Sequence, residues 1–252
     1  MTNTKQAKLV KQAAYPVVFL VDVDDTLLDN DRIQKDLQRH LESEYGQACR
    51  DRYWVIQEDL MKKLGYRDYL GALQQYRVEH PHEVHLLAMS SFLLDYPFAD
   101  RLYPKALDVL ARLRTRGRTV ILSDGDVVFQ PRKVERSGIS AAVDGEVLIY
   151  IHKEEALDDV RRRYPADHYV LIDDKLRILD AVRKAWGDQV TTVCPRQGNF
   201  ANDPQIVAAF PAADLTIEHI GDLLEHGFAD FMENSQCTES SGLDSKHSEV
   251  KQ

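Results

Sequence analysis

Cysteine is scarce in this chain of 252 residues, and its three copies are scattered. Cys49, Cys194 and Cys237 lie far apart and form no Cys-x-x-Cys pair. An odd number of distant cysteines fits neither a disulfide framework nor a cysteine-ligated zinc site. We therefore expect a protein of the reducing cytoplasm.

Long hydrophobic runs are also lacking. The N-terminus is polar until Ala13, and the apolar stretch from Val17 to Val21 reaches only five residues before it meets Asp22. A signal-peptide core needs about 7–15 apolar residues and a membrane-spanning helix needs about 20. Neither is predicted, and we expect no membrane partner.

Positive charge is in deficit, since 32 Lys and Arg stand against 41 Asp and Glu and leave a net charge of −9. Such a surface repels a phosphate polymer, so nucleic-acid binding is not expected. The chain also contains no GxGxxG, GxxxxGK[ST] or GxSxG pattern. Dinucleotide-binding, P-loop and serine-hydrolase interpretations therefore have no support.

Short apolar runs rich in β-branched residues alternate with helical patterns along the chain. This alternation is typical of a parallel sheet built from strand–helix–strand units. Most runs are apolar at both alternating sets of positions, as a sheet covered on both faces requires. The sequence therefore predicts a doubly wound α/β core with strands at Val17–Val21, Thr119–Leu122, Glu146–Ile151, Tyr169–Ile172 and Val190–Val193, and with Leu215–Ile217 as a candidate sixth strand at an edge.

Two helices of this core are marked by their ends. A helix between Pro104 and Gly117 carries leucine at every third position, with proline near its start and glycine past its end. A second helix runs from Leu176 to Trp186 and stops at Gly187.

The stretch from residue 31 to residue 100 has a different character. It lacks β-branched runs and consists of helix formers, so we expect an all-helical insertion that forms a second, small domain. The core then comprises residues 14–30 and 101–233, preceded by an N-terminal extension at 1–13. Residues 234–252 are rich in Ser, Glu and Lys, which predicts a disordered tail.

Acidic residues crowd the carboxyl end of the first predicted strand, where ligands bind in open α/β sheets. Asp22, Asp24 and Asp25 fall within four residues. At ~4 Å two such charges repel by about 4 kcal/mol, at an effective dielectric of about 20, unless a cation or a raised pKa relieves them. Asp22 and Asp24 are two apart, on the same side of an extended chain, so they can supply ligands to one Mg²⁺ ion.

A second acidic pair, Asp173 and Asp174, follows the predicted strand Tyr169–Ile172. A parallel sheet can bring both acidic pairs to the same edge, so that two sites become one. Ser123 and Lys153 follow two further strands and add a hydroxyl group and a cation to this edge. Together these residues predict an anion-binding site with a metal.

These residues resemble the motifs of the haloacid dehalogenase (HAD) superfamily of aspartate-nucleophile phosphatases. The first motif, Asp-x-Asp-x-Thr after an apolar strand, matches Asp22–Thr26. Ser123 matches the second motif and Lys153 the third, and Asp173-Asp174 matches the acidic pair of the fourth. The resemblance covers roughly residues 15–220 and implies a Rossmann-like core with an inserted helical cap.

The chain departs from the commonest form of the superfamily at the fourth motif. No glycine precedes the acids, and the next acid, Asp180, stands six positions beyond Asp174. The paired-acid variant of the superfamily has this form. By that resemblance Asp174 is favoured as the metal ligand and Asp173 as its supporting neighbour, although the two could exchange roles.

The resemblance implies a Mg²⁺-dependent phosphohydrolase. Asp22 would attack the phosphorus of a phosphate monoester, and Asp24 would protonate the leaving alkoxide and later deprotonate a water molecule. The phosphate would be bound by Ser123, Asp124, Gly125 and Lys153. The Mg²⁺ ion would be held by Asp22, Asp24, Asp173 and Asp174.

The helical insertion lies between the first and second motifs, which is the helical (C1-type) cap arrangement of the superfamily. Such a cap implies a lid that closes over a small phosphorylated metabolite. Candidates for substrate contact within it are Arg67, Tyr69, Tyr76 and Arg77.

Three alternatives stay open: a phosphomutase, a dehalogenase of the same superfamily, and a protein that binds a phosphorylated ligand without turnover. Asp24 favours a phosphatase, because a departing halide needs no proton. The sequence does not predict an oligomeric state.

Two other clusters of residues are interpreted as non-functional. His80, His82 and His85 lack metal-site spacing, and Arg161–Arg163 are expected to form a solvated helix face.

Overall fold

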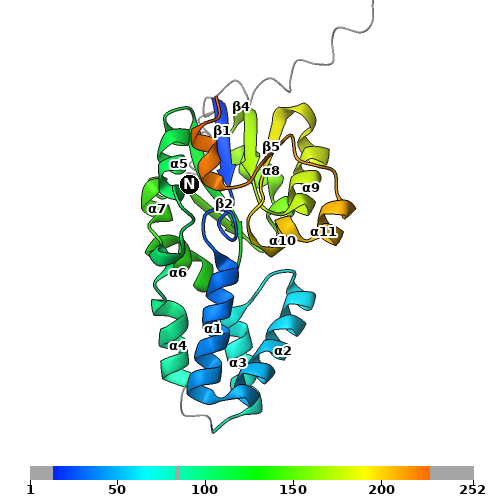
Figure 1. Cartoon of the computed structure of the whole chain (residues 1–252). Helices are drawn as coiled ribbons and strands as arrows, with labels where there is room; N and C mark the ends of the chain where they lie inside the picture. Colours follow the sequence, from blue (N-terminus) through cyan, green and yellow to red (C-terminus); the bar gives the residue numbers. More distant parts are fainter. Residues whose placement is uncertain (1–13, 83–85, 228–252) are drawn as a thin grey trace, which may run out of the picture.

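The computed structural model describes residues 14–82 and 86–227 (Figure 1). The predicted N-terminal extension and C-terminal tail lie outside these residues. Six parallel strands form one sheet in the order β3-β2-β1-β4-β5-β6. The strands are β1 (Tyr15–Val21), β2 (Arg118–Asp124), β3 (Val147–Tyr150), β4 (Ala166–Ile172), β5 (Val190–Pro195) and β6 (Leu215–Ile217).

The doubly wound α/β prediction is confirmed, including Leu215–Ile217 as a strand at one edge. β1 lies inside the sheet between β2 and β4. Strand β2 runs two residues further than predicted, because Ser123 and Asp124 still pair with Ile149 and Tyr150 of β3. The serine of the predicted site therefore belongs to the strand itself.

Alternate residues of β1 face the two sides of the sheet and enter two hydrophobic clusters. Phe19 and Val21 belong to one cluster, and Val18 and Leu20 belong to the other. This explains why the strand is apolar at both sets of positions. Helices α5 (Ala106–Arg114), α6 (Phe129–Arg136) and α7 (Ile139–Ala142) contribute to the first cluster, and α8 (Leu157–Arg163) and α9 (Leu176–Trp186) to the second.

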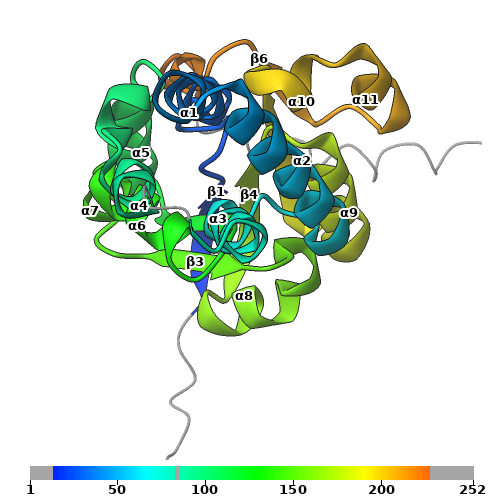
Figure 2. The ribbon, with the colours of Figure 1, turned by 90° about the horizontal axis from the view of Figure 1, so that it is seen from below.

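Four helices connect β1 to the rest of the sheet and form the helical insertion: α1 (Asn30–Tyr45), α2 (Gln47–Leu64), α3 (Tyr69–Glu79) and α4 (Leu86–Asp95). They lie beyond the carboxyl ends of the strands (Figures 1 and 2). Leu37, Leu41, Tyr53 and Ile56 are buried and help to form the interior of the insertion. These helices fall where an all-helical segment is predicted, and the domain limits at 31 and 100 stay predictions.

The chain from β5 to β6 carries two short helices, α10 (Gly198–Asn202) and α11 (Pro204–Ala209). They project from the sheet toward α2 of the insertion (Figure 1). Short 3-10 turns occupy Phe98–Arg101, Lys153–Glu155, Gly187–Gln189 and Ile220–Leu224. None of the described helices combines the length and the apolar character that crossing a bilayer requires.

Truncating the centre of the sheet should cost much of the stability. Leu20 is fully buried in β1, so we expect Leu20→Ala to lower the free energy of unfolding by ~2–5 kcal/mol through lost burial and a cavity. Urea denaturation measures this change. Val55→Ala, at a side chain that is 48% exposed, is the control and should change it by less than about 0.5 kcal/mol. Equal losses from both variants would contradict the assigned burial.

Candidate active site

The register of the sheet brings the predicted site residues to one edge. Val21, the last residue of β1, pairs with Ile121 of β2 and Ile172 of β4. The next residue, Asp22, continues this pairing, since its N–H donates to the Ile172 carbonyl at 2.9 Å. The acids that follow β1 and β4 are therefore neighbours in space.

Lys153 lies buried between two of these acids. Its Nζ is 2.5 Å from Asp22 Oδ1 and 2.5 Å from Asp173 Oδ2, and it donates to the Leu122 carbonyl at 3.3 Å. Burial lowers the pKa of Lys153, but the charges of Asp173 and Asp22 outweigh burial and hold it well above its ordinary value. Lys153 is thus a fixed positive charge in contact with Asp22.

A third carboxylate, Asp174, joins the two that contact this lysine. Asp22, Asp173 and Asp174 each offer an oxygen within 4.8 Å of the others, and all three side chains are buried. Within the described residues, neither carboxylate oxygen of Asp174 has a hydrogen-bond partner. Burial raises the pKa of Asp174 well above its ordinary value, although nearby Lys175 lowers it.

This donor set fits a hard divalent cation. A buried carboxylate without a partner is costly, and oxygen ligands of this kind suit Mg²⁺. Asp173 is already engaged, because it contacts Lys153 and accepts the Lys175 N–H at 2.9 Å. The unpartnered oxygens therefore favour Asp174 over Asp173 as the direct ligand.

Thr26 links the two acidic stretches. Its Oγ1 donates to Asp22 Oδ2 at 3.4 Å and accepts the Asp174 N–H at 3.1 Å. Gln197, which follows β5, donates its Nε2 to the Thr26 carbonyl at 2.9 Å. The threonine of the first motif thus sets the position of one acidic stretch against the other.

The carboxylate of Asp24 does not join this cluster. It pairs instead with Lys133 of α6, whose Nζ lies 2.7 and 3.0 Å from its two oxygens and 3.1 Å from Asn30 Oδ1. The prediction that Asp22 and Asp24 share one face assumed that the first strand continues through both residues. β1 ends at Val21, and the chain turns through Asp25 at a φ of 59°. A metal-binding role of Asp24 stays a prediction that would rest on its backbone carbonyl.

Ser123 is buried beside Asp24 and shares a partner with it. Gln130 Nε2 donates to Ser123 Oγ at 2.9 Å and lies 3.5 Å from Asp24 Oδ2. Gly125 permits this approach, because a Cβ there would lie 2.5 Å from the Gln130 side chain. The carboxylate of Asp124 accepts the Lys153 N–H at 2.7 Å, which ties the second motif to the third.

Sequence reasoning missed Gln130 and Lys133. Lys133 is 1% exposed although its helix α6 also carries Arg132, which is partly exposed, and Glu135, which is exposed. The available signal was a glutamine and a lysine three positions apart on the helix that follows Ser123, which places both on one helix face.

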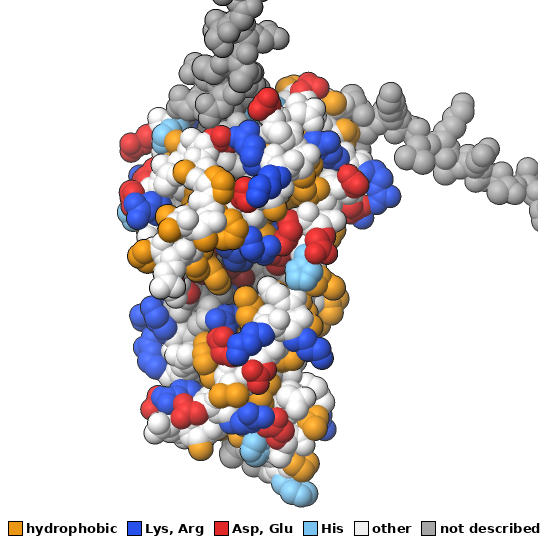
Figure 3. Space-filling model, turned by 90° about the vertical axis from the view of Figure 1, so that its right-hand side faces the viewer, with side chains coloured by type: hydrophobic (Ala, Val, Ile, Leu, Met, Phe, Trp, Pro, Cys, Tyr) orange, Lys and Arg blue, Asp and Glu red, His pale blue; other side chains and the backbone are white. Residues whose placement is uncertain are grey.

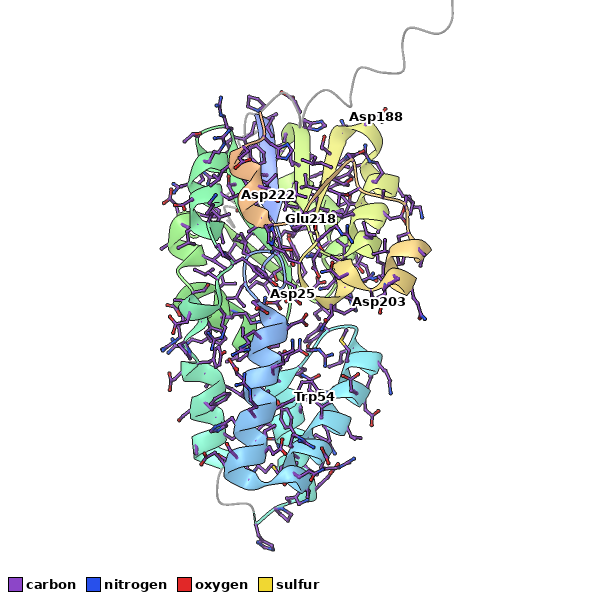
Figure 4. The ribbon with its side chains drawn as sticks, viewed as in Figure 1. Asp25, Trp54, Asp188, Asp203, Glu218 and Asp222 are labelled. Atoms are coloured by element: carbon purple, nitrogen blue, oxygen red, sulfur yellow. The ribbon has the colours of Figure 1, made fainter. Side chains whose placement is uncertain are left out.

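A cavity of about 290 Å³ lies between this cluster and the helical insertion. Figure 3 shows the hollow between the two parts, and Figure 4 places Asp25 where they meet. Asp24, Asp124, Gly125 and Lys133 line the cavity from the sheet side.

Of the four predicted substrate-contact residues, Arg67 and Tyr69 line the cavity, whereas Tyr76 and Arg77 do not. Tyr76 is buried inside the insertion and Arg77 is exposed on its surface.

Comparison with known proteins agrees with this geometry. The sequence model of the haloacid dehalogenase-like hydrolases matches residues 17–185. A crystal structure from Burkholderia xenovorans, named as a haloacid dehalogenase-like hydrolase, is 59% identical, with a TM-score of 0.81 over 84% of this chain and 99% of that chain. The chain belongs to the haloacid dehalogenase-like hydrolase family.

More distant structures share the fold. The HAD-hydrolase YfnB from Bacillus subtilis, solved with magnesium, is 17% identical with a TM-score of 0.55 over 82% of this chain and 96% of that chain. The L-2-haloacid dehalogenase from Xanthobacter autotrophicus, with covalently bound chloropropionic acid, is 17% identical with a TM-score of 0.54 over the same shares. Among proteins of curated function, none matches this chain.

Mg²⁺ should stabilise the protein if the three carboxylates hold it. At a concentration of 100 times Kd, the expected gain is ~2.7 kcal/mol, because the cation binds only the folded site. A thermal melt with Mg²⁺ or with EDTA measures it. Asp174→Asn should lose most of the shift, whereas Asp188→Asn, at the end of the molecule opposite the insertion (Figure 4), should keep it. An undiminished shift in Asp174→Asn would contradict the assignment.

Proposed function

We propose that this protein is a Mg²⁺-dependent phosphohydrolase that acts on a small phosphorylated metabolite through an aspartyl-phosphate at Asp22. The observation that carries the proposal is the pairing of Asp22 with the buried Lys153, beside a separately held carboxylate, Asp24. This arrangement offers an anionic nucleophile, a cation for the phosphate and a group for proton transfer.

Asp22 is positioned for attack. Lys153 and Thr26 hold its two oxygens, so its side chain is fixed before substrate arrives. Bound by Asp22 and Asp174, with Asp173 as their supporting neighbour, a Mg²⁺ ion would supply the positive charge that lets an anionic nucleophile approach an anionic phosphate. Lys153 and the hydroxyl of Ser123 would hold the equatorial oxygens, where charge accumulates.

The reaction then needs two proton transfers, which we assign to Asp24. In the first half, an oxygen of Asp22 bonds to phosphorus, the bond to the alcohol oxygen breaks, and Asp24 gives that oxygen a proton. In the second half, Asp24 takes a proton from a water molecule that attacks the aspartyl-phosphate. Phosphate is released and Asp22 is regenerated. Lys133 and Gln130 orient the Asp24 carboxylate throughout.

Dehalogenation is the second candidate, because the structural relatives include dehalogenases. These relatives share only the fold, at 17% identity. A halide leaves without a proton, so a dehalogenase would not need the carboxylate of Asp24, which Lys133 holds in place. A phosphomutase would share the covalent step and return the phosphoryl group to its substrate, and a non-catalytic binder would release no phosphate.

The size of the substrate follows from the helical insertion. We propose that it acts as a cap, because it lies over the carboxyl edge of the sheet and encloses the cavity of about 290 Å³. Such a space suits a small molecule, and a macromolecular substrate would not fit under it. The partner we propose is therefore a small phosphorylated metabolite. We also propose a cytoplasmic location and no nucleic-acid or membrane partner.

Asp22→Asn tests the nucleophile. We expect it to lower the release of phosphate from p-nitrophenyl phosphate with Mg²⁺ by at least about 10³-fold, because an amide cannot form the covalent intermediate. Asp188→Asn is the matched control and should retain full activity. Retained turnover in Asp22→Asn would exclude the proposed nucleophile.

Asp24→Asn tests proton transfer. For an alkyl phosphate, whose leaving alkoxide needs a proton, we expect a decrease in kcat of about 10²–10⁴-fold. For p-nitrophenyl phosphate, whose leaving anion is already stable, the decrease in the rate of the first half-reaction should be smaller, as measured by burst kinetics.

The wild type should release no chloride from 2-chloropropionate. Chloride release without phosphate release would replace the proposal by dehalogenation.

A further inference from the structure

The cavity has an apolar wall that the proposed chemistry does not use. Phe200 on α10, Ile206 on α11 and Phe210 just after α11 line the cavity from the sheet side. All three are only partly buried, so part of each ring or chain faces open space. Hydrophobic side chains gather over α10 and α11 beside the hollow (Figure 3). The wall comes from the β5–β6 connection and not from the helical insertion.

The opposite side of the cavity also carries apolar and aromatic groups, beside the polar Asn30, Gln34 and Arg67. Met61 at the end of α2 and Tyr66 in the loop after it line the cavity from the insertion, and Leu176 at the start of α9 adds to the sheet side. The space beyond the acid cluster is therefore bounded by apolar surface from two parts of the chain. Such surface favours an apolar ligand group by the area it removes from water.

Most of the cations around the cavity are already neutralised. Of the four that line it, three are paired within the described part of the chain: Arg67 with Glu58, Arg177 with Glu154, and Lys133 with Asp24. Arg67 also lies over the ring of Trp54, at 5.5 Å from its centroid. A second anionic group on the substrate would have to displace one of these carboxylates. The charges thus disfavour a substrate that is anionic away from its phosphate.

Lys175 is the fourth cation and differs from the rest. Across residues 14–82 and 86–227, its ammonium makes no ion pair with a carboxylate, and it lies 5.7 Å from the centroid of Phe200. Lys175 directly follows Asp174 in the sequence, so it stands where the acid cluster gives way to the apolar wall. A phosphate held at Asp22 would face this cation, and the rest of the substrate would continue along Phe200.

We propose that the alcohol part of the substrate is an uncharged aromatic group, seated between the wall of Phe200, Ile206 and Phe210 and the facing Tyr66. This inference rests on the proposed phosphatase function and specifies its substrate class. A cavity of about 290 Å³ lies at the lower end of the ligand-site range, which suits one ring system beside a phosphate. Aromatic side chains on both sides allow offset or edge-to-face contact with such a ring.

Three phosphomonoesters with alkoxide leaving groups test the substrate class. Benzyl phosphate carries a ring, ethyl phosphate carries none, and phosphoglycolate carries a second anionic group. We expect kcat/KM for benzyl phosphate to exceed both others by at least about tenfold, mainly through a lower KM. Comparable values for all three, or a preference for phosphoglycolate, would overturn the inference and leave the phosphatase proposal standing.

Variants of the wall locate the effect. Phe200→Ala and Phe210→Ala should each lower kcat/KM for benzyl phosphate about tenfold, and change it for ethyl phosphate by less than about threefold. Val207→Ala is the matched control, since Val207 lies on α11 in the same β5–β6 connection, is 39% exposed and does not line the cavity. An equal loss for both substrates would assign these phenylalanines a purely structural role.

A charged variant covers the case in which a phenylalanine variant fails to fold. Ile206 is partly exposed, so Ile206→Arg adds a cation to the wall at a position that solvent still reaches. We expect it to lower kcat/KM for benzyl phosphate and raise it for phosphoglycolate, each by at least about fivefold. An unchanged ratio would overturn the placement of the ring. If none of the three esters releases phosphate with the wild type, the phosphatase proposal itself is wrong and this inference falls with it.

Discussion

The burial of three neighbouring carboxylates, two of them paired with one lysine, is the constraint on which the site depends. Asp22, Asp173 and Asp174 each offer an oxygen within 4.8 Å of the others at the edge of the sheet, and all three side chains are buried. Lys153 supplies one positive charge, and removing either partner of such a buried pair leaves an uncompensated charge. The folded chain therefore gathers three acidic groups at a place where one lysine contacts only two of them, and a divalent ion would favour the ionised form of all three.

The fold holds the acids in place against their mutual repulsion. The parallel pairing of β1 with β4 fixes Asp22 beside the acids that follow Ile172, through backbone hydrogen bonds that no side-chain repulsion can easily break. Thr26 and Gln197 add a second layer of hydrogen bonds behind these carboxylates. A site built on strand ends in this way is rigid before any ligand binds, as electrostatic stabilisation of a transition state requires.

The strands and the acid cluster could be predicted from the sequence because they follow from short-range patterns. A β-branched run indicates a strand, and in a parallel sheet the ends of neighbouring strands must meet, so Asp22 and Asp174 converge whatever the details of the helices. The partner of Asp24 could not be predicted in this way. Lys133 is 109 positions away in sequence, and its approach depends on the turn at Gly125 that aims α6 at the site.

Prediction is limited in the same way within the insertion. The sequence shows which residues are polar or aromatic but not which face of a helix they occupy. Arg67 and Tyr69 reach the cavity, whereas Tyr76 turns into the interior of the insertion.

The β5–β6 connection, by contrast, is fixed to the site itself. Gly198, at a φ of 69°, approaches Asp25 so closely that a Cβ would lie 2.5 Å from its side chain, and the Asn199 N–H donates to Asp31 at 2.8 Å. The Gly198 contact holds the start of α10 against the loop that follows Asp22, and the Asn199 hydrogen bond ties it to the first turn of α1. The apolar wall is therefore anchored both to the loop beside the proposed nucleophile and to the start of the insertion, and that makes it suited to selecting the substrate.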